Sequence, residues 1–258
     1  MKNPGIELKK IRQFLESIPL SQYREETKGI KWVEQDLPKA VLPLASIFQF
    51  YWKDRNFVSF EEWFENFWQE INSNSISKKA LEKFKQYYFN RSLNENDWFK
   101  KGFKARMYRT WVSLLTQLDF CYMLDYVCAK KGKNFTIVCS AELDMKGIDA
   151  QVDDICFQIA KISERKEARP GRTKRRIIPI PYAVFNLEEL NRRLRSERTK
   201  NKEKIKKMLN AFNKYFLVLQ NGFVVFKESY IEKIVEHMGD YYKLKEIVYQ
   251  VYLELLGE

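Results

Sequence analysis

The chain has 258 residues, 45% of them hydrophobic and 15% aromatic, with 46 Lys and Arg against 34 Asp and Glu. This composition excludes a disordered tail and suits one large folded domain or a main domain with an appendage. The net charge of +12 suits a polyanionic partner, with a solvated basic surface as the alternative, and the distribution of the charge has to decide between them. The single histidine, His237, argues against a histidine base and a Cys/His zinc site.

No apolar run approaches the roughly 18 residues of a membrane span. The N-terminal stretch MKNPGIELKKIRQ carries charges where a secretory signal would be apolar. We therefore expect a cytoplasmic protein with no membrane partner. The four cysteines, at positions 121, 128, 139 and 156, form no C-x-x-C pair, and we expect them to be buried, inert thiols.

The first half of the chain is predicted to be helical. Apolar residues recur at helical spacing in four segments, residues 6–17, 58–72, 77–91 and 95–129. Ser75 and Ser77 are candidate N-caps of the third segment. The second part of the fourth, WVSLLTQLDFCYMLDYVCA, is apolar on nearly every face, which predicts a buried helix.

The pattern changes after residue 130, where the turn KGKN leads into a segment rich in β-formers, FTIVCSAEL (135–143). Gly147, a short strand and a turn at Asp153-Asp154 follow, and then the alternating strand ICFQIAKIS (155–163). Three neighbouring strands with tight connections predict an antiparallel meander. IPIPYAVF (178–185) is predicted to be a fourth strand.

Helices are predicted over residues 187–197 and 200–218, followed by a short strand, GFVVFK, and helices to the end, with His237 at a helix end. The predicted fold class is therefore α/β (α+β), with a helical first half, a central mixed sheet and helices after it. We expect a helical region at residues 1–130 that packs on a core at residues 131–258, or one continuous domain.

Strand alternation predicts which side chains of residues 155–163 share a face. Gln158 and Ala160 stand side by side on one face. Lys161, the only lysine of this strand, points to the other face.

Acidic residues lie close to this strand. A hairpin through Asp153-Asp154 would bring Asp149 level with Gln158, and Glu142 and Asp144 lie just upstream. Three carboxylates and an amide oxygen would then reach one point, a set of hard oxygen ligands that suits Mg²⁺. The alternative is ordinary turn chemistry, because turns collect aspartates and one Asp-x₈-Gln match arises easily by chance.

The segment ERKEARPGRTKRR (164–176) holds seven Lys and Arg against two Glu and contains Pro170-Gly171, so we expect a loop. Beside the expected metal site such a loop would be placed to contact nucleic-acid phosphates or guanine edges, although a mobile solvated loop is the alternative. The candidate DNA-contacting residues are Lys166, Arg172, Lys174, Arg175 and Arg176. In a second basic run, residues 192–207, charges go round the whole helix, and we expect much of it to be a solvated face.

Several stretches together resemble the PD-(D/E)XK nuclease fold and, more narrowly, the TaqI-type type II restriction endonucleases. They occur in the family's order along most of the chain: KWVEQDLP (31–38), YWK (51–53), FEEWF (60–64), ARMYRT (105–110), FCY (120–122), ELDMKGIDA (142–150), QIAK (158–161), PY (181–182) and NGFVVFKE (221–228). The resemblance implies a homodimer that cleaves double-stranded DNA within the palindrome TCGA with Mg²⁺, alongside a cognate DNA methyltransferase.

Carried over residue by residue, the resemblance makes Asp149 the principal metal ligand and Asp144 the accompanying acid, with Glu142 nearby as a further candidate ligand. Gln158 holds the place usually taken by Asp or Glu. The family has Gln-Ile-Lys where this chain has Gln158-Ile159-Ala160, so the catalytic lysine is missing.

Ala160 is either an engineered Lys-to-Ala change, which we favour because the surrounding motif is intact, or natural, with a lysine such as Lys166 reaching in. Two other functions remain open. One is a non-cleaving, site-specific DNA-binding protein with the same fold, and the other is a repair or structure-specific nuclease of the superfamily.

Overall fold

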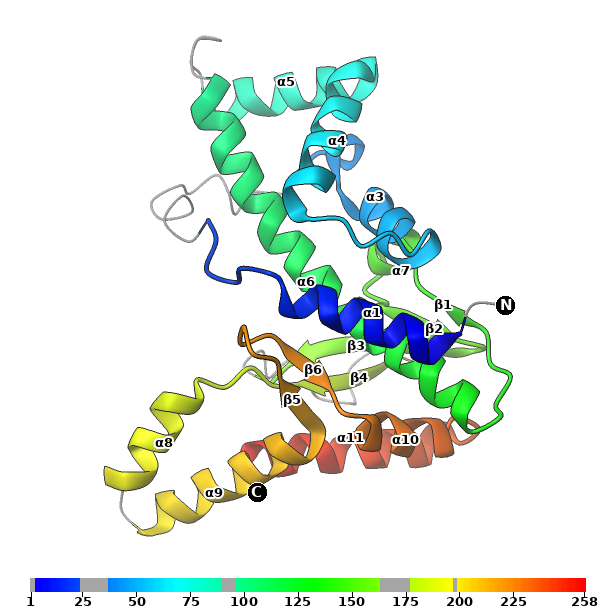
Figure 1. The fold of residues 1–258 in the computed structure, drawn as a ribbon, viewed down its shortest axis with the longest axis vertical. Coiled ribbons are helices and arrows are strands. Elements are labelled where there is room, and N and C mark those ends of the chain that lie inside the picture. The colour runs from blue at the N-terminus through cyan, green and yellow to red at the C-terminus, as the bar shows by residue number, and fades with distance from the viewer. Residues whose placement is uncertain (1–2, 24–36, 90–95, 163–176, 197–198) are drawn as a thin grey trace. The chain divides into compact units, whose positions relative to one another are not determined.

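The computed structural model describes residues 3–23, 37–89, 96–162, 177–196 and 199–258 (Figure 1). The chain forms two compact units, one of Met1–Glu16 with Thr116–Glu258 and the other of Ser17–Leu115. Helix α6 (Asn96–Lys130) contributes residues to both. The expected division into a helical region at residues 1–130 and a core at residues 131–258 stays a prediction.

The unit Ser17–Leu115 is helical in the part that the structure describes. Besides the start of α6, its elements are η2 (Lys39–Val41), α3 (Leu44–Phe48), η3 (Gln49–Lys53), α4 (Phe60–Ser73) and α5 (Ser75–Phe89). The predicted serine caps of α5 are wrong, because Oδ1 of Asn74 accepts hydrogen bonds from the backbone N–H groups of Ile76 and Ser77, both at 3.0 Å. The Ser77 hydroxyl donates instead to the carbonyl oxygen of Ala40, at 2.9 Å.

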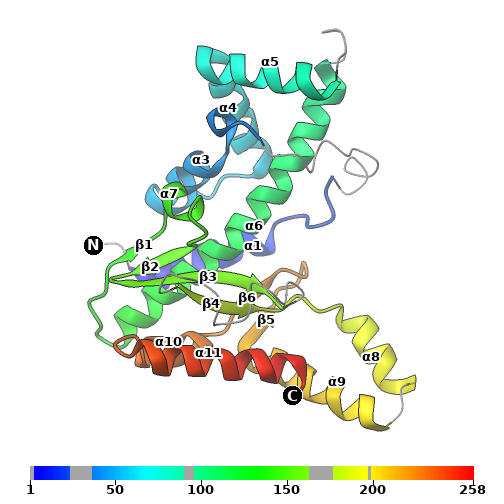
Figure 2. The same cartoon turned by 180° about the vertical axis from the view of Figure 1, so that it is seen from behind.

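The other unit is built around a four-stranded sheet with the order β1-β2-β3-β4, seen from behind in Figure 2. Its strands are β1 (Ile137–Val138), β2 (Ala150–Val152), β3 (Ile155–Lys161) and β4 (Ile177–Tyr182). The first three pair antiparallel, which confirms the predicted meander, and β4 pairs parallel to β3. At the β4 edge Pro179 and Pro181 are tolerated, because only a strand with an unpaired side can hold residues without an N–H donor.

The predicted strand over residues 135–143 is wrong in its second half. Strand β1 ends at Val138, and residues Ala141–Asp144 form a short helix, α7. Ser140 caps this helix, since its hydroxyl accepts a hydrogen bond from the backbone N–H of Leu143 at 3.3 Å. A good N-cap followed by Ala, Glu and Leu therefore outweighs the β-formers before it.

Helices complete this unit: α1 (Pro4–Glu16), α8 (Leu187–Ser196), α9 (Thr199–Tyr215), α10 (Glu228–Glu236) and α11 (Tyr241–Leu256). The predicted helix over residues 200–218 ends at Tyr215, because Phe216–Val218 form strand β5, which pairs with β6 (Val224–Phe226). Gly222, with a φ of 90°, allows the tight turn between them. His237 is the C-cap of α10, as predicted.

Helix α6 covers one face of the sheet, since the ring centroids of Phe120 and Phe157 lie 5.8 Å apart. Helix α11 packs on β4, and Figure 2 shows it running alongside the sheet. The second part of α6 is buried along most of its length, which confirms the prediction from its apolar sequence. Among the described helices, none combines the length and the apolar content that a membrane-crossing segment requires.

Candidate active site

Asp149 lies at the start of the hairpin formed by β2 and β3 and is only 7% exposed. Its backbone N–H donates to the carbonyl oxygen of Phe157 at 2.8 Å, and its Oδ2 accepts a hydrogen bond from the backbone N–H of Ile159 at 2.5 Å. The carboxylate is thus held level with Gln158, where the hairpin was predicted to bring it. This backbone clamp fixes the position of the acidic group on the sheet.

The turn between α7 and β2 lies over the side chain of Gln158. A Cβ atom added to Gly147 would stand 3.7 Å from Nε2 of Gln158. Gly147 has a φ of 73°, a conformation that glycine adopts without strain. The glycine therefore lets the chain turn back from α7 towards Asp149 close to the Gln158 amide.

Asp144 is the last residue of α7, and its carboxylate is held by a residue of α6. Nε2 of Gln117 donates a hydrogen bond to Oδ1 of Asp144 at 3.2 Å. Burial raises the pKa of Asp144, and the hydrogen bond from Gln117 opposes that shift. Oε1 of Gln117 is buried and has no hydrogen-bond partner among the described residues.

Gln117 was not among the residues predicted from the sequence. The signal that could have found it is a polar side chain inside the segment WVSLLTQLDFCYMLDYVCA, which was predicted to be a buried helix. The pairing with Asp144 joins residues 27 positions apart, which no local pattern indicates.

Glu142 lies on α7 and is exposed. The prediction that it sits at the end of a strand is corrected by the helix over residues 141–144. Within the ranges that the structure describes, no three His, Cys, Asp or Glu side chains gather as a metal site. The expected convergence of Glu142 with Asp144 and Asp149 is therefore not seen.

Ala160 shares the face of Gln158 on β3 and is 1% exposed, whereas Lys161 is exposed. The pairing of β3 with β4 is continuous here, with Ala160 opposite Pro181 and Lys161 opposite Tyr182. Because no bulge shifts the alternation, Lys161 stays on the opposite face. The predicted faces are confirmed, with Lys161 on the face opposite that of Gln158 and Ala160.

Two of the buried cysteines, Cys128 and Cys139, are poor nucleophiles. Cys121, Cys128 and Cys139 are buried, as predicted, whereas Cys156 is partly exposed. Burial raises the pKa of Cys128 to about 11 and that of Cys139 well above its usual value. A thiol with a raised pKa carries little thiolate at neutral pH and is a poor nucleophile.

Asp149, Asp144 and Gln158 carry oxygen ligands of the kind that suits a hard divalent cation, and both carboxylates lie close enough to Cys139 to contribute to the raised pKa of its thiol. Asp149 and Asp144 supply carboxylates, and Gln158 supplies an amide oxygen. The predicted DNA-contacting residues, Lys166, Arg172, Lys174, Arg175 and Arg176, lie outside the described residues.

Comparisons with known proteins agree on one family. The model of the TaqI restriction endonuclease family matches residues 8–238. The type II restriction enzyme TthHB8I of Thermus thermophilus is 32% identical over 241 residues, which cover 88% of this chain and 86% of that enzyme. The type II restriction enzyme TaqI of Thermus aquaticus is 32% identical over 242 residues, with the same coverage of 88% and 86%. No solved structure gave a significant match.

Proposed function

Because the chain belongs to the TaqI restriction endonuclease family, whose enzymes are site-specific deoxyribonucleases, we propose that it recognises the palindrome TCGA in double-stranded DNA and cleaves it with Mg²⁺. The DNA-cleaving class and the double-stranded substrate come with the family. The TCGA sequence, the choice of Mg²⁺ and the state of position 160 are our proposal.

The observation that carries this proposal is the clamp on Asp149. A nearly buried carboxylate fixed beside Gln158 by the backbone N–H of Ile159 is a preorganised oxygen ligand. We assign metal binding to Asp149 and Asp144, with Gln158 adding a neutral oxygen and Glu142 as the outer candidate. Bound Mg²⁺ would polarise the scissile phosphate and lower the pKa of a bound water.

Position 160 decides how fast this chain cuts. The family's lysine would place a cation and a proton-transfer group beside the water that attacks the phosphate. Ala160 offers only a methyl group there, so we propose that this chain is a Lys-to-Ala form that binds its site and cuts it very poorly. Ala160 also favours the second candidate function, that of a non-cleaving protein that binds DNA site-specifically.

We further propose a cytoplasmic homodimer that acts beside a cognate DNA methyltransferase. Each protomer would present one site to one strand of the palindrome, since a two-fold symmetric target matches a two-fold symmetric protein. Contact with the bases and phosphates of the target is assigned to Arg172, Lys174, Arg175, Arg176 and Lys166, on the strength of their charge and chemistry.

The test compares duplexes with a central TCGA and with the same bases permuted, each with Mg²⁺ or with EDTA. We expect tight binding to the TCGA duplex alone and, with Mg²⁺, slow cleavage of it alone. Equal binding to both duplexes would favour a structure-specific nuclease and contradict the proposal. Binding that is specific, with no cleavage even after lysine is placed at position 160, would favour the non-cleaving protein.

Asp149→Asn is expected to abolish the Mg²⁺-dependent change in DNA binding while the fold survives. Asparagine still accepts the hydrogen bond from the Ile159 N–H but lacks the negative charge that holds a divalent ion. Calorimetric titration of Mg²⁺ into the protein–DNA complex measures this loss. Asp153→Asn, which removes the same charge from the exposed turn of the hairpin, is the matched control and should change nothing. Undiminished metal uptake by Asp149→Asn would contradict the assignment.

Gln117→Leu is expected to weaken Mg²⁺ uptake by the DNA complex about 10-fold to 100-fold, the usual effect of removing a group that orients a metal ligand. The Asp144 carboxylate would lose the amide that fixes it at 3.2 Å. Gln220→Leu, which alters an exposed glutamine in the turn after β5, is the control. If both variants take up Mg²⁺ like the unmodified chain, Gln117 has no part in positioning Asp144.

A further inference from the structure

The two helices α8 and α9 carry a large share of the protein's positive charge. They hold nine Lys and Arg against three Glu, so their 27 residues contribute six of the twelve net positive charges of the 258-residue chain. From the sequence alone this run was expected to be mainly a solvated face. The position of α8 and α9 in the fold, after the end of β4, suits these charges to binding an anionic ligand.

The hairpin of α8 and α9 separates its apolar and basic sides. Leu190, Ile205 and Phe212 are buried, and most of the basic side chains are exposed. Some are paired with carboxylates: Arg192 with Glu189, Lys206 with Glu203, and Lys214 with Glu254.

Three exposed cations of the hairpin have no carboxylate oxygen within 4.0 Å in the described ranges, although one of them, Lys207, lies close enough to Glu203 to help lower the pKa of that carboxyl group. They are Arg195 on α8 and Lys204 and Lys207 on α9. Lys204 and Lys207 are three residues apart and therefore lie on neighbouring positions of one helical face. Cations of this kind on a rigid helix are available to bind phosphate without first breaking an ion pair.

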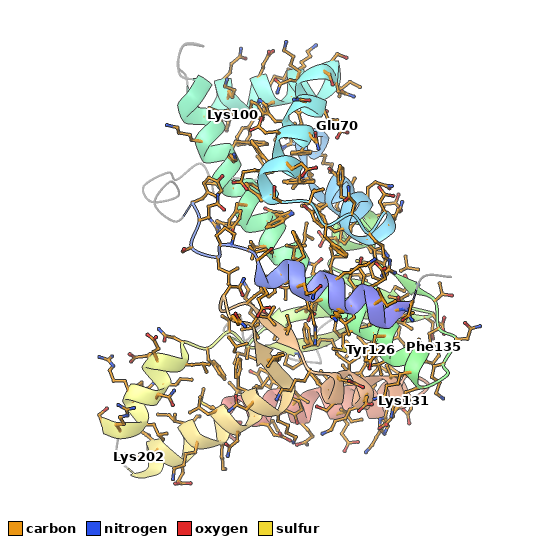
Figure 3. All side chains as sticks on the ribbon, in the orientation of Figure 1. Glu70, Lys100, Tyr126, Lys131, Phe135 and Lys202 are labelled. Atoms are coloured by element: carbon orange, nitrogen blue, oxygen red, sulfur yellow. The ribbon has the colours of Figure 1, made fainter. Side chains whose placement is uncertain are left out.

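The hairpin leaves the sheet at the end where the candidate site lies. The parallel strands β3 and β4 end at Lys161 and Tyr182, and Asp149 is held beside Ile159, near this end. Helix α8 begins at Leu187, five residues after β4 ends. Figures 1 and 2 show α8 and α9 projecting beyond the tips of β3 and β4, and Figure 3 shows Lys202 at the outer part of the hairpin.

We propose that the α8–α9 hairpin binds the phosphates of double-stranded DNA next to the cleaved palindrome, through Arg195, Lys204 and Lys207. The inference rests on the proposed function, because it needs a duplex held at the Asp149 site. Helix α9 has 17 residues and so spans about 25 Å at roughly 1.5 Å per residue. Such a helix can follow several successive phosphates, which on one strand recur about every 3.4 Å along the axis of the duplex. Contacts of this kind add affinity without reading the bases.

The test is a triple variant with Arg195→Gln, Lys204→Gln and Lys207→Gln. Glutamine keeps helix propensity and removes only the charge. The matched control is Lys78→Gln, Lys79→Gln and Lys83→Gln on α5, whose lysines are also exposed and have no ion pair within 4.0 Å in the described part of the chain. Both triples lose the same net charge, and thermal melting checks that each is folded.

Affinity is measured by fluorescence anisotropy between about 50 and 200 mM salt. The probes are a TCGA duplex of about three helical turns and one of about one turn, roughly 30 and 10 base pairs. On the long duplex the α8–α9 triple should flatten the slope of log K against log salt by about 2 to 3, since each phosphate contact contributes about 0.9. On the short duplex it should bind like the unmodified chain, and the α5 triple should do so on both.

Other outcomes overturn the inference in distinct ways. An unchanged slope for the α8–α9 triple on the long duplex removes the hairpin from the DNA interface. Equal flattening by both triples means that overall charge alone acts, and equal flattening on both duplexes places the contacts within the palindrome. Failure of the unmodified chain to bind either duplex overturns the proposed function, and the inference with it.

Discussion

Ala160→Lys is expected to raise the single-turnover rate of TCGA cleavage by about 10²-fold to 10⁴-fold, the usual contribution of a positioned proton-transfer group. Position 160 shares the face of Gln158 on β3, beside the carboxylate of Asp149. A lysine there would bring its ammonium group to the metal-binding oxygens. The measurement is cleavage of a TCGA duplex with Mg²⁺ under excess enzyme.

Because position 160 is buried, the lysine variant needs a control of similar side-chain size. Ala160 is 1% exposed, so the four-carbon stem of a lysine must pack along apolar neighbours while its amine reaches the polar site. Ala160→Met is the matched control, because it adds a chain of similar length without the amine. We expect methionine to leave cleavage unchanged, and thermal melting of both variants reports any cost of the larger side chain.

Lys161→Ala in the same chain should change little, because Lys161 lies on the opposite face of β3. If the unmodified chain, with Ala160, already cuts as fast as Ala160→Lys, another residue supplies the missing proton-transfer group. That result would contradict our assignment of position 160 and favour a natural alanine.

Asp119→Ala is expected to lower the free energy of unfolding by about 3–5 kcal/mol, the range for breaking a buried ion pair by removing one partner. Asp119 is 0% exposed. Its Oδ1 accepts a hydrogen bond from Nε of Arg12 at 3.1 Å, and its Oδ2 accepts one from the backbone N–H of Phe226 at 2.8 Å. Arg12 also donates to the carbonyl oxygen of Phe226. One carboxylate thus joins α1, α6 and β6.

Burial raises the pKa of Asp119, whereas the Arg12 cation and the Phe226 N–H oppose that shift. Alanine would leave the guanidinium and a backbone N–H without their acceptor. Urea unfolding measures the loss of stability. The control is Glu203→Ala, which breaks an exposed ion pair and should leave the free energy of unfolding nearly unchanged.

The double variant Arg12→Leu with Asp119→Leu should recover part of the stability lost by Asp119→Ala, because it leaves no charge unpaired. A loss of about 0.5 kcal/mol or less for Asp119→Ala, as for ordinary surface substitutions, would contradict the importance of this network.

Much of the candidate site could be predicted because it depends on local geometry. Alternation along β3 is set by the backbone of an extended chain, so it separated Gln158 and Ala160 from Lys161. The tight turn at Asp153-Asp154 determined the register of the hairpin, and the register brought Asp149 level with Gln158. The family also followed from the sequence, because its motifs are short, ordered and chemically distinctive.

Local signals failed where two of them competed. The β-formers before Ser140 suggested a longer strand, but the serine cap begins α7 and moves Glu142 and Asp144 onto a helix. Helical periodicity likewise continued past Tyr215, where pairing of β5 with β6 ends the helix. Pairing with a distant strand outweighs a helix propensity worth tenths of a kcal/mol per residue.

The sequence by itself determined the family, the strand faces, the place of Asp149 level with Gln158 and the alanine on the Gln158 face at position 160. Only the tertiary structure decided that Gln117 holds Asp144 and that Arg12 pairs with Asp119, across 27 and 107 residues. It also decided that position 160 is buried and that the basic helices α8 and α9 follow the end of β4. Such contacts depend on how whole elements pack, to which every buried residue contributes, whereas turns and alternation depend on the covalent geometry of a few neighbours.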